Sequence, residues 1–476
     1  MPADFNLGLL VPELAIVTMV AMGAVLEIFL PELNRRFSAR INLLGILFVG
    51  LTLATGFFQS PATTLQGMFV RDPFSIFFKF LFLGTAASIF IMKQDANSAI
   101  RGPEFSLLLW STLLGMFFLV SSKDFLLFFV SLELLTLSLY ILAAYSKHDL
   151  LSIEAGLKYL VLGSLASAFM VYGISLLYAA SGTLSFTKLG EFAGSEGRTS
   201  LLFLAGILLV LSALGFKVAS VPFHVWVPDV YQGAPTPVVA FFSVASKSAG
   251  FAALLRILLE VIGPFEKERR LLFALFSALT LLYGNLGALV QKDIKRLLGY
   301  SSIGHAGFLL VAVAAARPQG KDALLYYLIA YAVTNLAAFL VVSIVEDSGG
   351  TQIEALKGLS ERSPLLAAGM FLAFLSLAGV PPLAGFFAKF FILLAAARAG
   401  FLWLVLLGAI NVAISLYYYL SVIRVVYFEK ARVETPIAIP RSSRILLYTL
   451  MAGIVVVGIW QAPFFRIASQ AAAVLF

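Results

Sequence analysis

The stretch Leu211-Ser-Ala-Leu-Gly-Phe-Lys-Val-Ala-Ser-Val-Pro-Phe-His224 places a lysine and a proline in a run that is otherwise apolar. No charged side chain occurs from Ser200 to Phe216. An ammonium group in hydrocarbon is costly, so Lys217 marks a functional site by default. Pro222 cannot donate a hydrogen bond to the carbonyl of Val218, four residues earlier. The stretch therefore predicts a broken transmembrane helix with a charge beside a free carbonyl, as found where ions or protons cross membranes.

The composition is that of a polytopic membrane protein. Of 476 residues, 61% are hydrophobic and 12% are charged, whereas a soluble domain has about 25% charged residues. Cysteine is absent, which excludes disulfides and cysteine-ligated iron–sulfur clusters on this chain. His148, His224 and His305 lie far apart and have no metal-ligand spacing. We therefore expect no metal or cofactor here, and we assign the net charge of +8 to topology-setting loops rather than to nucleic-acid binding.

The apolar runs predict an all-α protein with about fourteen transmembrane helices. Each run has about 20 residues, the length that crosses a bilayer, and charged residues or Gly/Pro breaks separate the runs. The first run lacks the basic start and the cleavage site of a signal peptide, so we expect it to be retained. The helices are expected at residues 7–30, 41–59, 73–92, 104–121, 124–146, 151–180, 200–221, 236–262, 270–290, 296–316, 322–346, 363–397 (interrupted), 399–428 and 442–464.

An even number of helices places both termini on one side of the membrane. Lys and Arg are somewhat more numerous in one set of alternate loops, which we expect in the cytoplasm. The termini should then lie outside the cytoplasm. The longest polar connections, 181–199 and 346–362, are too short to form a soluble domain.

Two of the expected helices combine a proline break with a lysine. The seventh is broken at Pro222, and the twelfth is broken at Gly379-Val-Pro-Pro382 and continues to Lys389. If helices 4–8 and 9–13 are repeats, the breaks occupy matching places, and five-helix repeats would be inverted. The alternative is a coincidence of two prolines. The expected divisions are an N-terminal three-helix segment (1–103), a first repeat (104–262), a second repeat (263–430) and a C-terminal helix (431–476).

Ionisable side chains inside or beside the spans form the candidate site. Burial disfavours an ammonium group and a nearby carboxylate favours it, so a buried Glu–Lys pair can switch its proton. Glu133 and Lys217 are the candidate pair. Further along the chain we expect a relay bridged by waters. Its stepping stones are Lys247, His305 and Lys389, with Lys158 and His224 as additional candidates.

Each candidate also has a structural interpretation. The three central lysines and Glu133 could fix helix packing, and Lys158 could form a local pair with Glu154 one turn away. His305 could be a satisfied helix-packing histidine, and His224 could orient the loop at the helix break. The proline-rich segment 221–238 predicts a loop and a short helix, with Trp226 and Tyr231 at a membrane interface.

Several long motifs resemble the antiporter-like subunits of respiratory complex I, which are related to Mrp-type antiporters. Within that family the chain is most similar to subunit N of NADH–quinone oxidoreductase. It has no room for the lateral helix of subunit L, and Lys389 stands where subunit M usually has a glutamate. The motifs are Leu214-Gly-Phe-Lys-Val-Ala-Ser-Val-Pro-Phe-His-Val-Trp-Val-Pro-Asp-Val-Tyr-Gln-Gly-Ala-Pro-Thr-Pro-Val238, Ala245-Ser-Lys247, Gln291-Lys-Asp-Ile-Lys-Arg-Leu-Leu-Gly-Tyr-Ser-Ser-Ile-Gly-His305 and Gly379-Val-Pro-Pro-Leu-Ala-Gly-Phe-Phe-Ala-Lys389.

The resemblance implies a proton-translocating membrane-arm subunit of a bacterial inner membrane. It implies that flavin, iron–sulfur clusters and quinone are bound by other subunits, and that the partners are subunits M, K, J and A. The family's acid–lysine pair maps onto Glu133 and Lys217, its central lysine onto Lys247 and its terminal lysine onto Lys389. Lys158 also matches a lysine of this subunit. Helix ten has no carboxylate that matches Glu133.

Two other functions remain open from the sequence. A secondary cation/proton antiporter of the Mrp type would share the fold and most of these residues. A membrane scaffold without transport would have a dry interior. Redox subunits among the neighbouring genes would favour complex I over the antiporter. Ordered waters between the lysines would count against the scaffold.

Overall fold

The computed structural model describes residues 6–29, 31–95, 102–315, 318–430 and 435–475, and this part of the chain is almost entirely helical. Short 3₁₀ turns occur at Leu7–Leu10, Thr55–Phe58, Gly263–Phe265 and Ile353–Leu356. The helices are α1 (Val11–Phe29), α2 (Pro31–Ala54), α3 (Pro73–Asp95), α4 (Pro103–Ser121), α5 (Phe125–Ala143), α6 (Leu150–Ser181), α7 (Phe186–Ser195), α8 (Leu201–Val218), α9 (Trp226–Gly233), α10 (Thr236–Phe241), α11 (Lys247–Glu260), α12 (Glu266–Ala288), α13 (Ile294–Ala314), α14 (Pro318–Gly349), α15 (Leu359–Arg362), α16 (Pro364–Ala378), α17 (Ala384–Arg398), α18 (Leu402–Phe428), α19 (Arg441–Ile459) and α20 (Gln461–Ala472).

The predicted all-α membrane fold is confirmed. In the described part of the chain, 13 helical segments are long and apolar enough to cross a membrane. The remaining predicted helix, 363–397, is divided into α16 and α17. The seventh, predicted at 200–221, ends as α8 at Val218, and α9 is the short helix predicted after the break. Both predicted discontinuities are therefore present.

Each discontinuity begins at a residue with left-handed backbone geometry, three positions before a proline. Ala219 has φ 62° and Gly379 has φ 91°. The next amide of each turn bonds back to the helix, Ser220 N–H to the Gly215 carbonyl at 2.9 Å and Val380 N–H to Leu375 at 3.0 Å. This is the Schellman arrangement that ends a helix by satisfying its last carbonyls. The helices therefore end by the same local geometry.

The predicted repeats also share the way in which their second helices begin. Asp124 caps α5 by accepting from the Leu126 N–H at 2.8 Å, and Asp293 caps α13 by accepting from the Arg296 N–H at 2.9 Å. Each aspartate also forms an isolated antiparallel bridge, Asp124 with Ser185 and Asp293 with Gln352. These matching starts support the predicted repeats, and their inverted orientation stays a prediction.

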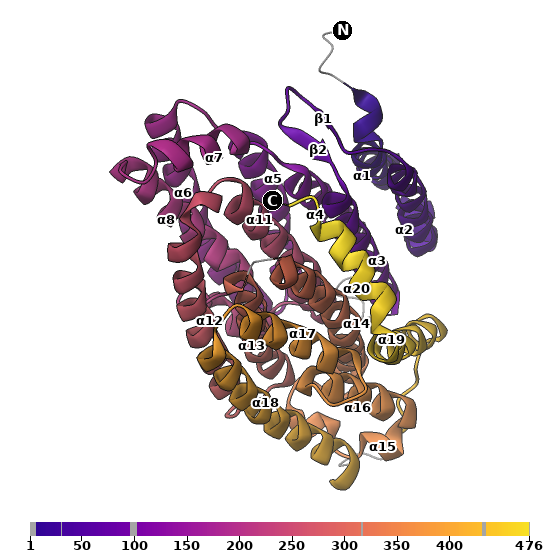
Figure 1. Ribbon diagram of the computed structural model, residues 1–476. Helices are drawn as coiled ribbons and strands as arrows, with labels where there is room; N and C mark the ends of the chain where they lie inside the picture. Colours follow the sequence, from indigo (N-terminus) through magenta and orange to yellow (C-terminus); the bar gives the residue numbers. More distant parts are fainter. Residues whose placement is uncertain (1–5, 30, 96–101, 316–317, 431–434, 476) are drawn as a thin grey trace.

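The N- and C-terminal segments pack against each other. In Figure 1, α20 lies alongside α3, and α1 and α2 form the adjacent edge. The sequence analysis did not anticipate the hairpin of β1 (Ala62–Thr64) and β2 (Phe69–Arg71), nor the separate helix α20. Two short strands of three residues are difficult to recognise because their alternation is too brief to stand out.

The predicted interfacial position of Trp226 and Tyr231 is wrong. Both side chains are buried in the protein, at 5% and 1% exposure. The Trp226 indole N–H donates to the carbonyl of Phe216 at 3.1 Å, and its ring stacks on Tyr159 at 4.7 Å. The carbonyl of Phe216 lies in the last turn of α8, where the amide four residues later does not continue the helix. It can therefore accept a hydrogen bond from the indole.

Candidate functional site

Glu133 and Lys217 lie on neighbouring helices, and each bonds to a hydroxyl group rather than to the other. The Ser167 hydroxyl on α6 donates to Glu133 Oε1 at 2.5 Å. Lys217 is 5% exposed in the last turn of α8, and its Nζ donates to Thr136 Oγ1 at 3.3 Å. Thr136 follows Glu133 by three residues on α5, so it lies on the same helix face. The structure thus brings Lys217 to the face of α5 that carries Glu133, while each member of the predicted pair bonds to a hydroxyl group.

Lys247 is buried at the centre of the eighth membrane helix, directly after a π-helical turn. That turn, Phe242–Ser246, separates α10 from α11. Such turns are rare and often occur at functional sites. The ammonium group is 3% exposed and donates to both oxygens of Ser302 on α13, with Nζ 2.5 Å from the carbonyl. It also lies 5.8 Å from the ring centre of Tyr331. The side chain of Lys217 packs against the same helix at Gly250, where an added Cβ would lie 3.2 Å from the Lys217 Cγ.

His305 lies between two tyrosine hydroxyls. Its Nδ1 is 2.5 Å from the hydroxyl of Tyr327 on α14, and its Nε2 is 3.3 Å from that of Tyr419 on α18. The Tyr419 hydroxyl is also hydrogen-bonded to that of Ser301. Which nitrogen carries the proton depends on the tautomer. The imidazole is therefore part of a polar chain that connects three helices.

Lys389 lies beside the second helix break. Its Nζ donates to the carbonyl of Ala378, the last residue of α16, at 3.0 Å and to Ser415 Oγ on α18 at 3.4 Å. The ring of Phe308 lies 5.2 Å away. A lysine next to a carbonyl freed by a helix break was predicted for Lys217, and the structure shows that arrangement at Lys389.

The two additional candidates lie apart from these buried groups. Lys158 forms the expected pair with Glu154 at 2.7 Å, and it also bonds to Asp229 on α9 at 2.6 Å. Arg296 on α13 binds the other oxygen of Asp229 at 2.6 Å. His224 lies in the loop after α8, where its ring packs on Tyr283 at 4.1 Å. Neither of its ring nitrogens has a hydrogen-bond partner among the described residues.

The buried lysines of the described chain differ in their partners. Lys79 pairs with Glu13 at 2.6 Å and Lys295 with Glu346 at 3.1 Å. By contrast, five other buried lysines donate to hydroxyl or carbonyl oxygens, which carry no net charge: Lys93, Lys217, Lys247, Lys321 and Lys389. Three of them were predicted as site residues and are hereafter the lysine row: Lys217, Lys247 and Lys389. A charged lysine and a neutral one can both satisfy such partners, whereas an ion pair holds the charged form.

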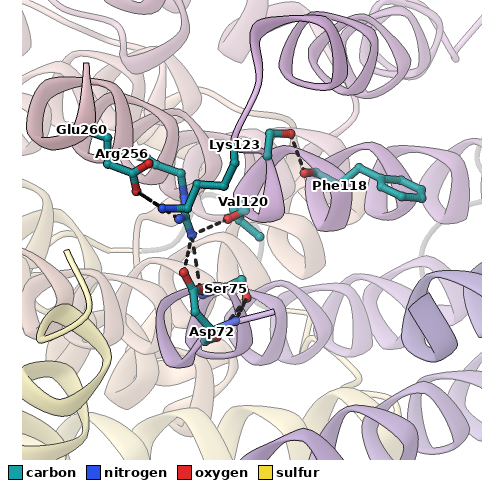
Figure 2. A network of polar contacts seen from close by, with 8 residues as sticks. Asp72, Ser75, Phe118, Val120, Lys123, Arg256 and Glu260 are labelled. Atoms are coloured by element: carbon teal, nitrogen blue, oxygen red, sulfur yellow. Dashed lines mark hydrogen bonds and ion pairs between the residues drawn. The ribbon is translucent and has the colours of Figure 1, made fainter. Parts of the chain in front are cut away.

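One buried network was missed by the sequence analysis. Figure 2 shows Arg256, on α11, between Asp72 and Glu260. Its Nη2 is 3.0 Å from Asp72 Oδ2 and 2.9 Å from the Val120 carbonyl, and Nη1 is 3.3 Å from Glu260 Oε1. Lys123 Nζ also binds Glu260 at 2.7 Å. A charged residue inside the expected span 236–262, four positions from a carboxylate, was the available signal.

The described residues contain no group of three potential metal-ligating side chains. The site is built from amines, one imidazole, one carboxylate and several hydroxyls. These groups can accept, hold and donate protons.

The chain is similar to known membrane proteins over nearly its full length. A family model described as "NADH:quinone oxidoreductase/Mrp antiporter, TM" matches residues 122–415. NADH-quinone oxidoreductase subunit N of Desulforamulus reducens is 37% identical over 98% of this chain and 98% of that protein. The same subunit of Chloroflexus aggregans is 37% identical over 99% and 98%.

Two solved structures are also similar. A chain of respiratory complex I from Thermus thermophilus with bound aureothin matches with a TM-score of 0.82 and 34% identity, covering 96% of this chain and 99% of that chain. A chain of the Mrp complex from Dietzia sp. has a TM-score of 0.85 at 21% identity, with 99% and 98% coverage. The second likeness shows the fold alone.

Proposed function

Because this chain belongs to the NADH:quinone oxidoreductase/Mrp antiporter family of membrane subunits, we propose that it translocates protons across the membrane within a respiratory NADH–quinone oxidoreductase. Its relatives are subunit N of that enzyme complex, as the sequence analysis predicted. The finer assignment, a relay through Glu133, the lysine row and His305, is part of the proposal.

The lysine row is the observation that carries the proposal. Its members are at most 5% exposed, yet their partners are neutral oxygens. A buried ammonium without a counter-ion is expensive, so each lysine can lose its proton at low cost when its surroundings change. Ionisable groups that face the interior of a membrane protein mark proton relays.

Glu133 can change the protonation state of Lys217, the lysine at one end of the row. While the Glu133 carboxylate accepts from Ser167, the hydrogen bond of Lys217 among the described residues is to the neutral hydroxyl of Thr136. A shift of the carboxylate toward Lys217 would favour the ammonium form of that lysine, and a shift back would favour proton release. A charged Lys217 favours proton loss from Lys247, and a charged Lys247 favours proton loss from Lys389, because like charges in a low-dielectric interior repel each other.

The partners and location follow from the family. We propose that electron transfer takes place on other subunits, which hold the flavin, iron–sulfur clusters and quinone. The proposed neighbours are the membrane subunits M, K, J and A, in a bacterial inner membrane. Both termini should lie outside the cytoplasm. Since the chain has no cysteine, single cysteines at the exposed positions Ser195 and Thr435 can report topology. An impermeant maleimide should label Ser195→Cys in spheroplasts and Thr435→Cys only in inverted vesicles.

The test is proton pumping by the assembled complex. Lys247→Met should lower the protons pumped per NADH oxidised in inverted membrane vesicles while assembly persists. The matched control is the double variant E13Q/K79M, which removes another buried lysine together with its carboxylate. Normal pumping by Lys247→Met in fully assembled complexes would refute the role of the lysine row.

The Mrp-type antiporter is the alternative function. The family model covers both classes, and the likeness to the Mrp complex is 21% identical. Identity of 37% to subunit N relatives over nearly the whole chain favours the redox-coupled complex. Sodium-dependent proton exchange by the chain without redox subunits would favour the antiporter.

A further inference from the structure

A cluster of hydroxyl groups lies between Lys247 and Lys389, and the hydroxyl of Tyr419 is at its centre. This side chain is fully buried on α18. Its hydroxyl is hydrogen-bonded to Ser301 and lies 3.3 Å from His305 Nε2. It therefore contacts two polar groups of α13 at once.

Tyr419 also connects to both lysines through its neighbours. On one side, Ser301 adjoins Ser302, the residue that binds Lys247. On the other side, Ser415 precedes Tyr419 by one helical turn and therefore lies on the same face of α18. Ser415 accepts from Lys389 at 3.4 Å. The hydroxyl of Tyr419 is thus the point at which the surroundings of Lys247, His305 and Lys389 meet.

We propose that Tyr419, together with His305 and Tyr327, passes the proton between the Lys247 end and the Lys389 end of the row. This inference rests on the proposed function. In one transfer step, the Tyr419 oxygen accepts a proton from the Ser301 side and releases its own proton to His305 Nε2. The imidazole then releases the proton on Nδ1 to the Tyr327 oxygen, 2.5 Å away.

The Lys247 ammonium is the proton source and returns a proton to the Ser301 side by way of Ser302, while Tyr327 releases its own proton through a bridging water to the neutral amine of Lys389. Each hydroxyl then ends with one proton, Lys247 has lost one and Lys389 has gained one, and the imidazole is again neutral with its tautomer exchanged.

A tyrosine on α14 provides a matched control. Tyr326 adjoins Tyr327 in the sequence and is also buried, but its hydroxyl donates to the Val457 carbonyl of α19 at 2.9 Å. A peptide carbonyl holds this hydrogen bond in place but offers no acid or base form near neutral pH. Tyr326 is therefore expected to position α14 against α19 without carrying protons.

The experiment compares Tyr419→Phe with Tyr326→Phe in the assembled complex. Each variant removes one hydroxyl oxygen from a buried tyrosine ring. Loss of a positioned proton-transfer group slows a proton step by about 100-fold or more. Tyr419→Phe should therefore abolish NADH-driven proton pumping in inverted vesicles and raise the solvent isotope effect on the residual rate. Tyr326→Phe should pump at the rate of the unchanged protein, and a structural defect would leave the isotope effect unaltered.

Lys389→Met and Tyr327→Phe in the same assay separate the possible outcomes. Loss of pumping in Lys389→Met with normal pumping in Tyr419→Phe would overturn this inference and leave the proposed function standing. Normal pumping in assembled Lys389→Met would instead overturn the proposed function. If Tyr419→Phe does not assemble, Tyr327→Phe decides: loss of pumping supports the tyrosine–histidine chain, and normal pumping refutes it.

Discussion

Replacement of Arg256 by methionine should destabilise the contact between the N-terminal segment and the first predicted repeat. The guanidinium group is 2% exposed and joins the start of α3, the end of α4 and α11. Without it, the buried carboxylate of Asp72 keeps, among the described residues, only the hydrogen bond from the Ser75 N–H at 2.7 Å. The Val120 carbonyl loses a donor at 2.9 Å. Methionine preserves most of the side-chain volume, so the loss is mainly electrostatic.

The magnitude follows from the partners that are left behind. Breaking a buried ion pair on one side costs about 3–5 kcal/mol. The double variant D72N/R256M removes both charges, and replacing a whole buried pair is often close to neutral. It should therefore recover about half or more of the lost stability. Such recovery would show that the unpaired charge, rather than lost packing, causes the defect.

The assay is the apparent melting temperature of the detergent-solubilised complex, with the assembled fraction measured in parallel. Arg269→Met is the control, because this buried arginine donates to a backbone carbonyl, that of Leu258, at 2.7 Å. It should cost only about 1–3 kcal/mol, the penalty for an unsatisfied carbonyl. Equal destabilisation by Arg256→Met and Arg269→Met, with no recovery in the double variant, would refute the reasoning.

The remaining predictions concern the helix breaks and Lys247, and stability is measured as the same melting temperature. Ala219→Gly should stabilise the complex by about 1 kcal/mol, because alanine is strained at φ 62°; a lower melting temperature would contradict this. Gly385→Ala should prevent stable assembly, since its Cβ would lie 1.8 Å from the Ser376 carbonyl oxygen; the control Gly84→Ala has no atom within 4 Å of its Cβ and should assemble normally. Ser302→Ala removes one of the two oxygens that bind Lys247 and should lower pumping more than assembly; unchanged pumping would show that the remaining carbonyl suffices.

The sequence predicted the helices, both discontinuities and the buried lysines because these depend on long apolar runs and on isolated charges within them. It did not predict which atoms the charges bind. Thr136, Ser302 and Ser415 are common residues in membrane helices, and nothing in their spacing distinguishes a lysine's partner from a residue that bonds its own helix. The arrangement of Arg256 with Asp72 depends on a contact 184 positions apart, which a local pattern does not show. Trp226 was placed at an interface because its amphipathic ring suits one, although the same indole N–H also suits a broken helix end.

Burial alone does not distinguish the charged residues proposed to exchange protons from those that stabilise the fold. Lys79 and Arg256 are as deeply buried as the members of the lysine row, but both have carboxylate partners. The carboxylate of Glu13, 2.6 Å from the ammonium group of Lys79, compensates its charge inside the protein. Lys247 has the two oxygens of Ser302 instead, and they can accept from an ammonium or an amine. The neutral partners are thus what makes the row able to exchange protons, and introducing a carboxylate at position 302 should trap Lys247 in its charged form and stop pumping.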